Sequence, residues 1–166
     1  MKIGIISDTH NNIEYTKKAM EYLKYEEHVK RVYHLGDEWE DVDAVAKVGL
    51  PIITVPGIYA EQYKDPAIPN KISEEIEGLK IIMTHDYDDY SDLEIAENDI
   101  ILSGHTHSYE LKCSLGKLYI NPGHLKEEYH KKRIATFAVM DILSDSLTAK
   151  IIDINYSELT GIDLKR

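Results

Sequence analysis

Residues 2–10 read Lys2-Ile3-Gly4-Ile5-Ile6-Ser7-Asp8-Thr9-His10. The short apolar run predicts a buried β-strand, and the Asp-x-His that closes it lies where the strand opens into a loop. A carboxylate and an imidazole side by side at a strand end are typical of a metal site. This pair alone is weak evidence for a metal site, because a loop histidine is often only a hydrogen-bonded turn residue.

The same arrangement recurs at three later points of the chain. Apolar stretches end in Gly36-Asp37, in Thr84-His85 and in Gly104-His105-Thr106-His107. Capping or turn hydrogen bonds explain each of these singly, whereas four ligand-bearing strand ends in one short chain favour a shared metal site. Mixed carboxylate and imidazole ligands suit Mn, Fe, Ni, Co or Zn better than Mg or Ca, which prefer oxygen ligands alone.

The hydrophobic pattern changes between the two halves of the chain. The first part alternates strands, predicted at 31–35 and 50–55 after the opening one, with helices at 13–27 and 41–48. This order implies parallel strands joined by right-handed crossovers. The rest is rich in hairpins, with strand pairs predicted at 71–76 and 79–84, at 109–114 and 117–121, and at 134–142 and 146–154. Two stacked sheets with helices outside follow from this change.

Three segments stand outside this pattern. Residues 58–70 and 86–92 are predicted as irregular loops, and no element is assigned to 155–166. The acidic run within 86–92 directly follows His85. Such a run is usually solvated, but here its position favours the mouth of the site.

Composition limits the class of protein. The chain has 166 residues, 43% hydrophobic and 30% charged, which predicts one globular domain over 1–166. Its apolar runs are far shorter than the roughly 20 residues that cross a bilayer, and no signal-type segment precedes the first strand, so we expect a soluble cytoplasmic protein. A net charge of −11 argues against a general nucleic-acid surface and suits a site that holds cations. The single cysteine, Cys113, is expected to be structural.

With Pro56-Gly57 and Asn121-Pro122-Gly123 added, these motifs stand in order along roughly residues 1–155. In that order they resemble the calcineurin-like metallophosphoesterase superfamily, specifically its small archaeal and bacterial phosphodiesterase branch. The resemblance implies an α/β (α+β) fold, a four-layer sandwich of two stacked mixed β-sheets flanked by helices. It also implies two metal ions that share a bridging aspartate. Asp8, His10, Asp37 and His107 would hold the first ion, and Asp37, His85 and His105 the second, with Mn the first choice among the metals named above.

The chain departs from this family after its third strand. The family normally has Gly-Asn there, and the Asn amide oxygen binds the second ion, whereas here Gly57 is followed by Ile58. The second site is therefore expected to be weak, completed by water or empty. Glu61 or Asp86 are candidate replacement ligands, although solvated loop acids are the simpler interpretation. Many relatives continue with a histidine that protonates the leaving group. Here Tyr59 takes that place, and a phenol with its ordinary pKa near 10 is a poorer acid at neutral pH.

The resemblance implies a phosphodiesterase in which a hydroxide bridging two metal ions attacks phosphorus in line. Asp37 and His105 would serve catalysis at the ions, with Tyr59 as the candidate proton donor. The substrate would be a small-molecule or nucleotide phosphodiester, which no segment of the sequence names. Two alternatives remain open. One is an inactive protein-binding scaffold, because a relative of this fold is a protein-sorting subunit; the other is a single-metal monoesterase or nuclease. A homodimer is among the oligomeric states left open.

Four histidines lie outside the ligand set. His34 lies inside a predicted strand and is expected to be buried and hydrogen-bonded near the site. His124 follows Asn121-Pro122-Gly123, where a loop could reach the substrate, although a surface position is favoured. His28 and His130 lie among charged residues and are expected to be solvated.

Overall fold

A six-stranded sheet carries the first half of the site. The computed structural model describes residues 1–44 and 46–166. The strand order is β13-β12-β11-β1-β2-β3, in which β1 is central and runs parallel to β2 and β3 but antiparallel to β11. Short apolar runs bounded by turns form the three parallel strands. The bounds are β1 Lys2–Ile6, β2 Arg31–His34, β3 Ile52–Thr54, β11 Thr136–Ile142, β12 Ser146–Asp153 and β13 Glu158–Lys165.

A five-stranded sheet in the order β4-β5-β6-β8-β7 carries the second half. Its middle strands β5, β6 and β8 are parallel, and hairpins add β4 and β7 at the two edges. A separate two-stranded ribbon is made by β9 and β10. The bounds are β4 Lys71–Ile76, β5 Leu79–Thr84, β6 Ile100–Leu102, β7 Glu110–Ser114, β8 Lys117–Asn121, β9 Tyr129–His130 and β10 Arg133–Ile134.

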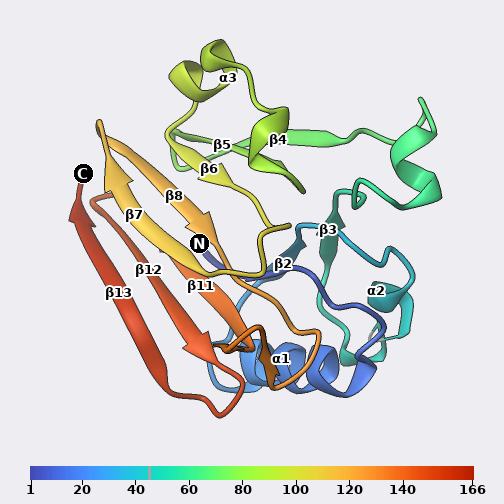
Figure 1. Cartoon of the computed structure of the whole chain (residues 1–166). Helices are drawn as coiled ribbons and strands as arrows, with labels where there is room; N and C mark the ends of the chain where they lie inside the picture. Colours follow the sequence, from blue (N-terminus) through green and yellow to red (C-terminus); the bar gives the residue numbers. More distant parts are fainter. Residues whose placement is uncertain (45) are drawn as a thin grey trace.

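Helices cover the outer faces of both sheets (Figure 1). The longest, α1 (Ile13–Tyr25), begins where the Asn12 side chain accepts a hydrogen bond from the Tyr15 amide, as helix N-caps do. The short α3 (Asp92–Glu97) is closed by a capping box between Ser91 and Glu94. The others are α2 (Asp41–Ala44) and the 3₁₀ turns η1 (Ala46–Val48), η2 (Glu61–Lys64) and η3 (Tyr87–Asp89).

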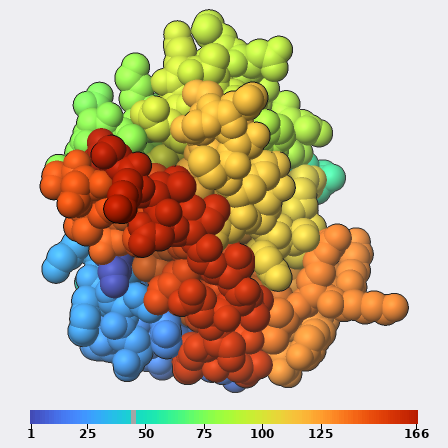
Figure 2. Space-filling view, turned by 90° about the vertical axis from the view of Figure 1, so that its left-hand side faces the viewer, coloured from blue at the N-terminus to red at the C-terminus, as the bar shows by residue number. Residues whose placement is uncertain are grey.

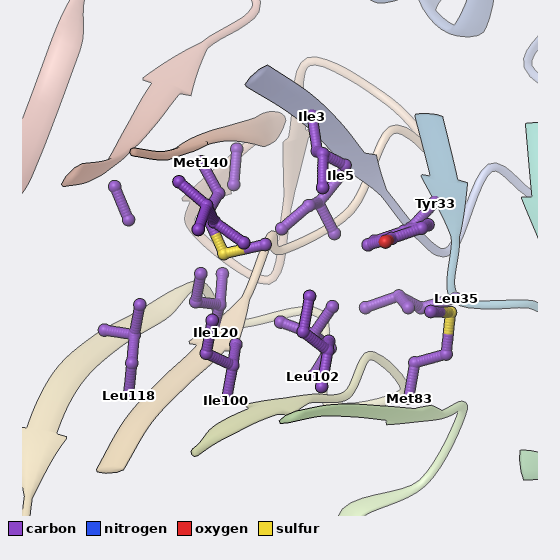
Figure 3. Close-up of a cluster of buried hydrophobic side chains, with 14 of the residues drawn as sticks. Ile3, Ile5, Tyr33, Leu35, Met83, Ile100, Leu102, Leu118, Ile120 and Met140 are labelled. Carbon is purple, nitrogen blue, oxygen red and sulfur yellow. The ribbon is translucent and has the colours of Figure 1, made fainter. Parts of the chain in front are cut away.

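The main core lies between the two sheets. In Figure 3, Ile3, Ile5 and Tyr33 of the larger sheet face Ile100, Leu102 and Ile120 of the smaller one. A second cluster packs α1 against the outer face of the larger sheet through Leu23, Val32 and Phe137. A third packs Ile95 of α3 against Ile82 and Ile101. The predicted four-layer sandwich of two mixed sheets with flanking helices is thereby confirmed.

Several local predictions need correction. The helix predicted at 41–48 is divided into α2 and η1, and residue 45 of it lies outside the described residues. Residues 86–92 are not an irregular loop, because η3 and the first residue of α3 lie there. The unassigned tail forms β13, which Figure 2 shows in red beside the yellow β7 and β8 segment, so that neighbouring edges of the two sheets meet.

No helix among the described residues is long and apolar enough to cross a membrane. Cys113 lies on β7 and is exposed, so it adds nothing to the core. The prediction that residues 1–166 form a single domain stays a prediction.

Candidate metal centre

The predicted ligands come from loops at the carboxyl ends of parallel strands in both sheets. Asp8 and His10 follow β1, Asp37 follows β2, His85 follows β5, and His105 and His107 follow β6. Backbone hydrogen bonds join these loops: Asp8 N donates to Gly36 O at 3.0 Å, and Gly104 N donates to His85 O at 2.8 Å. Residues that are up to 99 positions apart in sequence, as are Asp8 and His107, therefore meet at one end of the molecule.

Most of these residues have left-handed backbone conformations, with φ of 52° at Asp8, 47° at His10, 96° at Asp37, 66° at His105 and 56° at His107. Non-glycine residues adopt positive φ uncommonly, and such conformations gather at functional sites, where the surrounding structure holds them. The loops thus hold these residues in unfavourable backbone conformations that direct their side chains into the site.

Two glycines allow the loops to approach one another. A Cβ on Gly104 would lie 2.9 Å from Asp8 Oδ2 and would also collide with the Ser7 hydroxyl. A Cβ on Gly57 would lie 2.6 Å from Asp37 Cα. Both positions therefore require glycine because side-chain and backbone atoms of the site occupy the space.

Hydrogen bonds orient one carboxylate oxygen of Asp8, and the other oxygen faces His107. The residue is 1% exposed, and its Oδ2 accepts hydrogen bonds from Ser7 Oγ at 2.6 Å and from His105 N at 2.9 Å. Its Oδ1 lies 3.2 Å from His107 Nε2. The carboxylate is thus oriented by two donors, and Oδ1 remains available to a ligand.

The donor atoms of the first predicted set converge. His10 Nε2 lies 2.9 Å from His107 Nε2 and 2.8 Å from Asp37 Oδ2. Two atoms that each lie about 2.0–2.2 Å from one divalent ion are themselves about 3 Å apart, so these separations match the edges of a coordination shell. The buried Asp37 Oδ2 has no hydrogen-bond partner of good geometry within the described chain. The residues present therefore fit a divalent ion.

Two overlapping groups of donors meet these distances: Asp8, His10 and His107, and His10, Asp37 and Glu38. Sequence reasoning did not include Glu38, although its place directly after Asp37 was the available indication. Burial raises the pKa of Asp37, but the hydrogen-bonding contact with the His10 imidazole and the charges of nearby histidines outweigh it and hold that pKa below its usual value. Asp37 is thus held as a carboxylate in the second group, and His10 is the residue that both groups share.

The second predicted set is looser. His85 is buried, and its Nδ1 lies 2.7 Å from Leu35 O, an atom that can only accept, so Nδ1 carries the proton and Nε2 keeps its lone pair. The rings of His85 and His105 are 5.1 Å apart. Asp37, His85 and His105 do not form a further converging group among the described residues.

The position taken by Ile58 offers no donor atom to this second set. Ile58 is half-buried, and Glu61 is exposed on η2. Of the two candidate replacement ligands, Asp86 is the one beside the set, with Oδ2 3.7 Å from His105 Nε2. Its Oδ1 accepts a hydrogen bond from Asp88 N at 3.1 Å, which orients the carboxylate.

His34 is fully buried as predicted, but the expected hydrogen bond is wrong: neither ring nitrogen has a partner in the part of the chain that is described. Burial lowers the pKa of His34 to about 4, so the ring is neutral. A neutral ring packed under the site needs no counter-ion.

Two further histidines lie against the site. His124 is fully buried rather than at the surface, and burial lowers its pKa to about 4. His130 is not solvated: its side chain is 15% exposed, it contacts Glu127 at 2.7 Å, and its ring lies 4.9 Å from the His107 ring. By contrast, Tyr59 is 83% exposed, and its role as proton donor stays a prediction.

Comparison with known proteins agrees with this geometry. The family model for the calcineurin-like phosphoesterase superfamily domain matches residues 1–145. A phosphodiesterase of Methanocaldococcus jannaschii is 33% identical over 145 residues, covering 74% of this chain and 83% of its own length.

Among solved structures, an archaeal phosphodiesterase has a TM-score of 0.71 and 28% identity, covering 99% of this chain and 100% of its own. YfcE, a phosphoesterase from E. coli, has a TM-score of 0.73 and 18% identity, with 98% of each chain covered. Vps29 from Entamoeba histolytica has a TM-score of 0.73 and 19% identity, covering 100% of this chain and 99% of its own. The last two show the shared fold alone.

Proposed function

The chain belongs to the calcineurin-like phosphoesterase superfamily and is homologous to a phosphodiesterase; from that premise we propose that it hydrolyses phosphodiesters at the cluster of Asp8, His10, Asp37 and His107. The observation that carries the proposal is the set of donor separations of 2.8–3.2 Å among Asp8, His10, Asp37 and His107. Carboxylate and imidazole donors at these spacings suit a divalent cation, so the cluster fits a metal-dependent reaction.

Asp8, His10, Asp37 and His107 would hold the first ion, with Glu38 as a further oxygen donor beside Asp37. His85 and His105 would hold a second ion together with Asp37, and Asp86 would replace the amide oxygen that Ile58 does not supply. Two such ions lower the pKa of a coordinated water and neutralise charge on the entering and leaving oxygens of an in-line displacement. Mn, Fe, Ni, Co or Zn suit this donor set, with Mn the first choice.

The chain's own residues act by holding and orienting. Ser7 Oγ and His105 N fix Asp8 Oδ2, so Oδ1 points into the cluster. The Leu35 carbonyl fixes the tautomer of His85 and leaves Nε2 as the donor atom. Groups held in advance in this way need little reorganisation during reaction, which is the usual source of electrostatic catalysis. The leaving oxygen takes its proton from Tyr59 or from water.

Metal content and hydrolysis of bis(p-nitrophenyl) phosphate test this function together. We expect the Mn²⁺-loaded protein to hydrolyse the diester, and Asp8→Asn to lower kcat by more than about a hundredfold, because outer partners of metal ligands alone account for 10–100-fold. Asp145→Asn, which removes an exposed carboxylate from the turn between β11 and β12, is the matched control and should leave the rate unchanged.

Two outcomes would contradict the proposal. Metal bound at these residues without hydrolysis of any diester would support a scaffold instead. Full activity with one equivalent of metal per chain would support a single-metal monoesterase or nuclease.

A further inference from the structure

A basic hairpin lies at one side of the candidate metal centre. Residues 126–134, named here the basic arm, contain Lys126, Lys131, Lys132 and Arg133 against only Glu127 and Glu128, in a chain whose net charge is −11. Strands β9 and β10 pair His130 with Arg133 and Tyr129 with Ile134, which leaves Lys131 and Lys132 as a two-residue turn. Figure 2 shows this orange segment standing out from the body of the molecule.

The turn carries lysine where its shape favours other residues. Lys131 has a φ of 49° and Lys132 a φ of 67°, the left-handed pair of a type I′ hairpin turn. Asn-Gly and Asp-Gly are strongly preferred in such turns because a Cβ raises the energy of both central residues. Two adjacent lysines that replace the favoured pair at an exposed tip indicate a use for their charge.

The basic arm is attached to two of the three loops that carry the first ligand set, those after β1 and β6. Arg133 Nη1 donates to Thr106 O at 2.9 Å, between His105 and His107. On the other side, Asn12 Nδ2 donates to Lys126 O at 2.9 Å. The His130 ring packs 4.9 Å from the His107 ring, one residue before the lysine turn. These contacts hold the turn beside the metal centre.

Charge is distributed unequally around the centre. Across the described ranges, none of Lys126, Lys131, Lys132 and Arg133 forms an ion pair with a carboxylate; within the basic arm Glu127 pairs with His130 instead. Next to His105, a cavity of about 550 Å³ is lined by carboxylates and aromatic rings, among them Asp86, Asp88 and Tyr109. The basic arm therefore adds positive potential beside the centre, whereas the lining of the cavity next to His105 includes several carboxylates.

We propose that the basic arm binds a second phosphoryl group of the substrate, so that the preferred substrates are phosphodiesters in which one ester arm carries a further phosphate. This inference rests on the proposed phosphodiesterase function and names the class of its substrate. Lys131 and Lys132 contact the second phosphate, and the scissile phosphorus lies at Asp8, Asp37 and His107. The other ester group of the substrate, which faces Asp86 and Asp88, is neutral or cationic.

Two matched substrates test the proposal. Thymidine 5′-(p-nitrophenyl phosphate) and its 3′-phosphorylated form differ by one phosphate, and propyl and 3-phosphonopropyl p-nitrophenyl phosphate repeat the comparison without a nucleoside. We expect kcat/KM to be at least about fivefold higher for the phosphate-bearing member of each pair, because its KM is lower. For that member, log kcat/KM should also fall more steeply with log salt concentration, by about one unit of slope per lysine. A preference for the phosphate-bearing member in both pairs would show that the basic arm recognises the phosphate alone. A preference confined to the thymidine pair would show that recognition also requires the nucleoside.

The variants separate charge from turn shape. Lys131→Asn with Lys132→Gly removes both charges and suits the turn, so we expect an unchanged melting temperature and loss of the preference for the second phosphate. Lys131→Arg with Lys132→Arg should keep the preference. Lys17→Gln with Lys18→Gln removes two cations from α1 as the control and should change nothing.

Binding without catalysis distinguishes the failure of this inference from that of the proposed function. Adenosine 3′,5′-bisphosphate should bind the metal-free protein in isothermal titration, and at least about fivefold more weakly after Lys131→Asn with Lys132→Gly. Equal hydrolysis of both members of each pair, with equal bisphosphate binding by wild type and variant, would contradict the phosphate-binding role of the basic arm. It would leave the proposed phosphodiesterase function unaffected. No hydrolysis of any ester, with the binding difference present, would overturn the function and leave the anion site.

Discussion

Ile58 is the residue at which we expect this chain to depart from its family's pattern, and the structure around Gly57 bears on that expectation. Gly57 approaches Asp37 so closely that a Cβ would lie 2.6 Å from Asp37 Cα. Ile58 therefore directly follows the residue whose backbone packs against Asp37, the candidate ligand shared by the two ions. A side chain there that carries an oxygen would extend the second donor set, and isoleucine leaves that place to Asp86 or to water.

Replacing Ile58 by asparagine should strengthen the second site. We expect Ile58→Asn to tighten binding of a second Mn²⁺ by about tenfold or more, because an amide oxygen is added to His85, His105 and Asp37. Titration calorimetry of the metal-free protein measures both affinities. Ile58→Leu keeps the volume without a donor atom and should leave the second affinity as it is; equal tightening by leucine would show that coordination is not the cause.

The sequence was sufficient for some residues of the site and not for others. Asp8, His10 and His107 could be found because each lies in a short motif at the end of an apolar run, and the structure brings their donor atoms together. His124 and His130 were misplaced, because their burial depends on packing against His107 from another part of the chain. Contacts of that kind leave no local pattern in the sequence.

At the level of elements, α1 is joined to the larger sheet by an ionic contact at its carboxyl end as well as by its apolar face. Glu27 is buried beyond the end of α1, with Oε2 3.2 Å from Lys2 Nζ of β1 and Oε1 2.8 Å from Lys150 Nζ of β12. Burial raises the pKa of Glu27, but hydrogen bonds from Lys150 and Lys2 outweigh it and lower the pKa below the usual value.

Removing this carboxylate should destabilise the protein in a pH-dependent way. We expect Glu27→Gln to lower the free energy of unfolding at pH 7 by about 1–3 kcal/mol, because two partly buried ammonium groups lose their partner. Since the folded pKa of Glu27 is depressed, its stabilisation is present above about pH 4.5 and is lost as the pH falls through the folded pKa. Urea unfolding should show a larger difference between wild type and variant at pH 7 than at pH 3; a difference of equal size at both pH values would point to packing instead.

Elements with strong periodicity or a clear turn could be predicted, and short or exposed ones could not. The hairpin of β4 and β5 was predicted with its observed bounds because alternation and Glu77-Gly78 define it. Strand β6 has three residues, too few to show a period. Strand β13 has its side chains largely exposed at a sheet edge, so its sequence lacks a buried face that would mark it.

For the molecule as a whole, the candidate metal centre joins two sheets that also meet through the apolar core and through an ion pair between Arg31 of β2 and Glu74 of β4. Loops from β1 and β2 supply donors from one sheet, and loops from β5 and β6 supply them from the other. An ion bound there links the layers, and a ligand that binds only the folded state adds its binding free energy to stability.

Metal removal should therefore lower thermal stability. At a free Mn²⁺ concentration about 100-fold above Kd, the gain is about 2.7 kcal/mol, or roughly 5–10 °C in Tm for a chain of this size. Differential scanning calorimetry with Mn²⁺ and with EDTA measures the shift. Asp8→Asn should show a much smaller shift, and an equal shift in that variant would place the stabilising ion elsewhere.

The stacked arrangement of two sheets could be predicted from the change between a parallel half and a hairpin-rich half. The neighbour of β1 could not, because β11 pairs with it across more than a hundred residues and long-range pairing leaves no trace in either segment alone. The resemblance to a known family supplied what periodicity could not, namely an expectation of which ligands would share an ion.

The central place of β1 also affects how the protein is made. The end of β11 at Ile142 follows the end of β1 at Ile6 by 136 residues, and at about 5–20 residues per second their synthesis takes roughly 7 to 27 seconds. During that interval β1 and α1 lack their contacts with β11, and β2 is the neighbouring strand already available to β1.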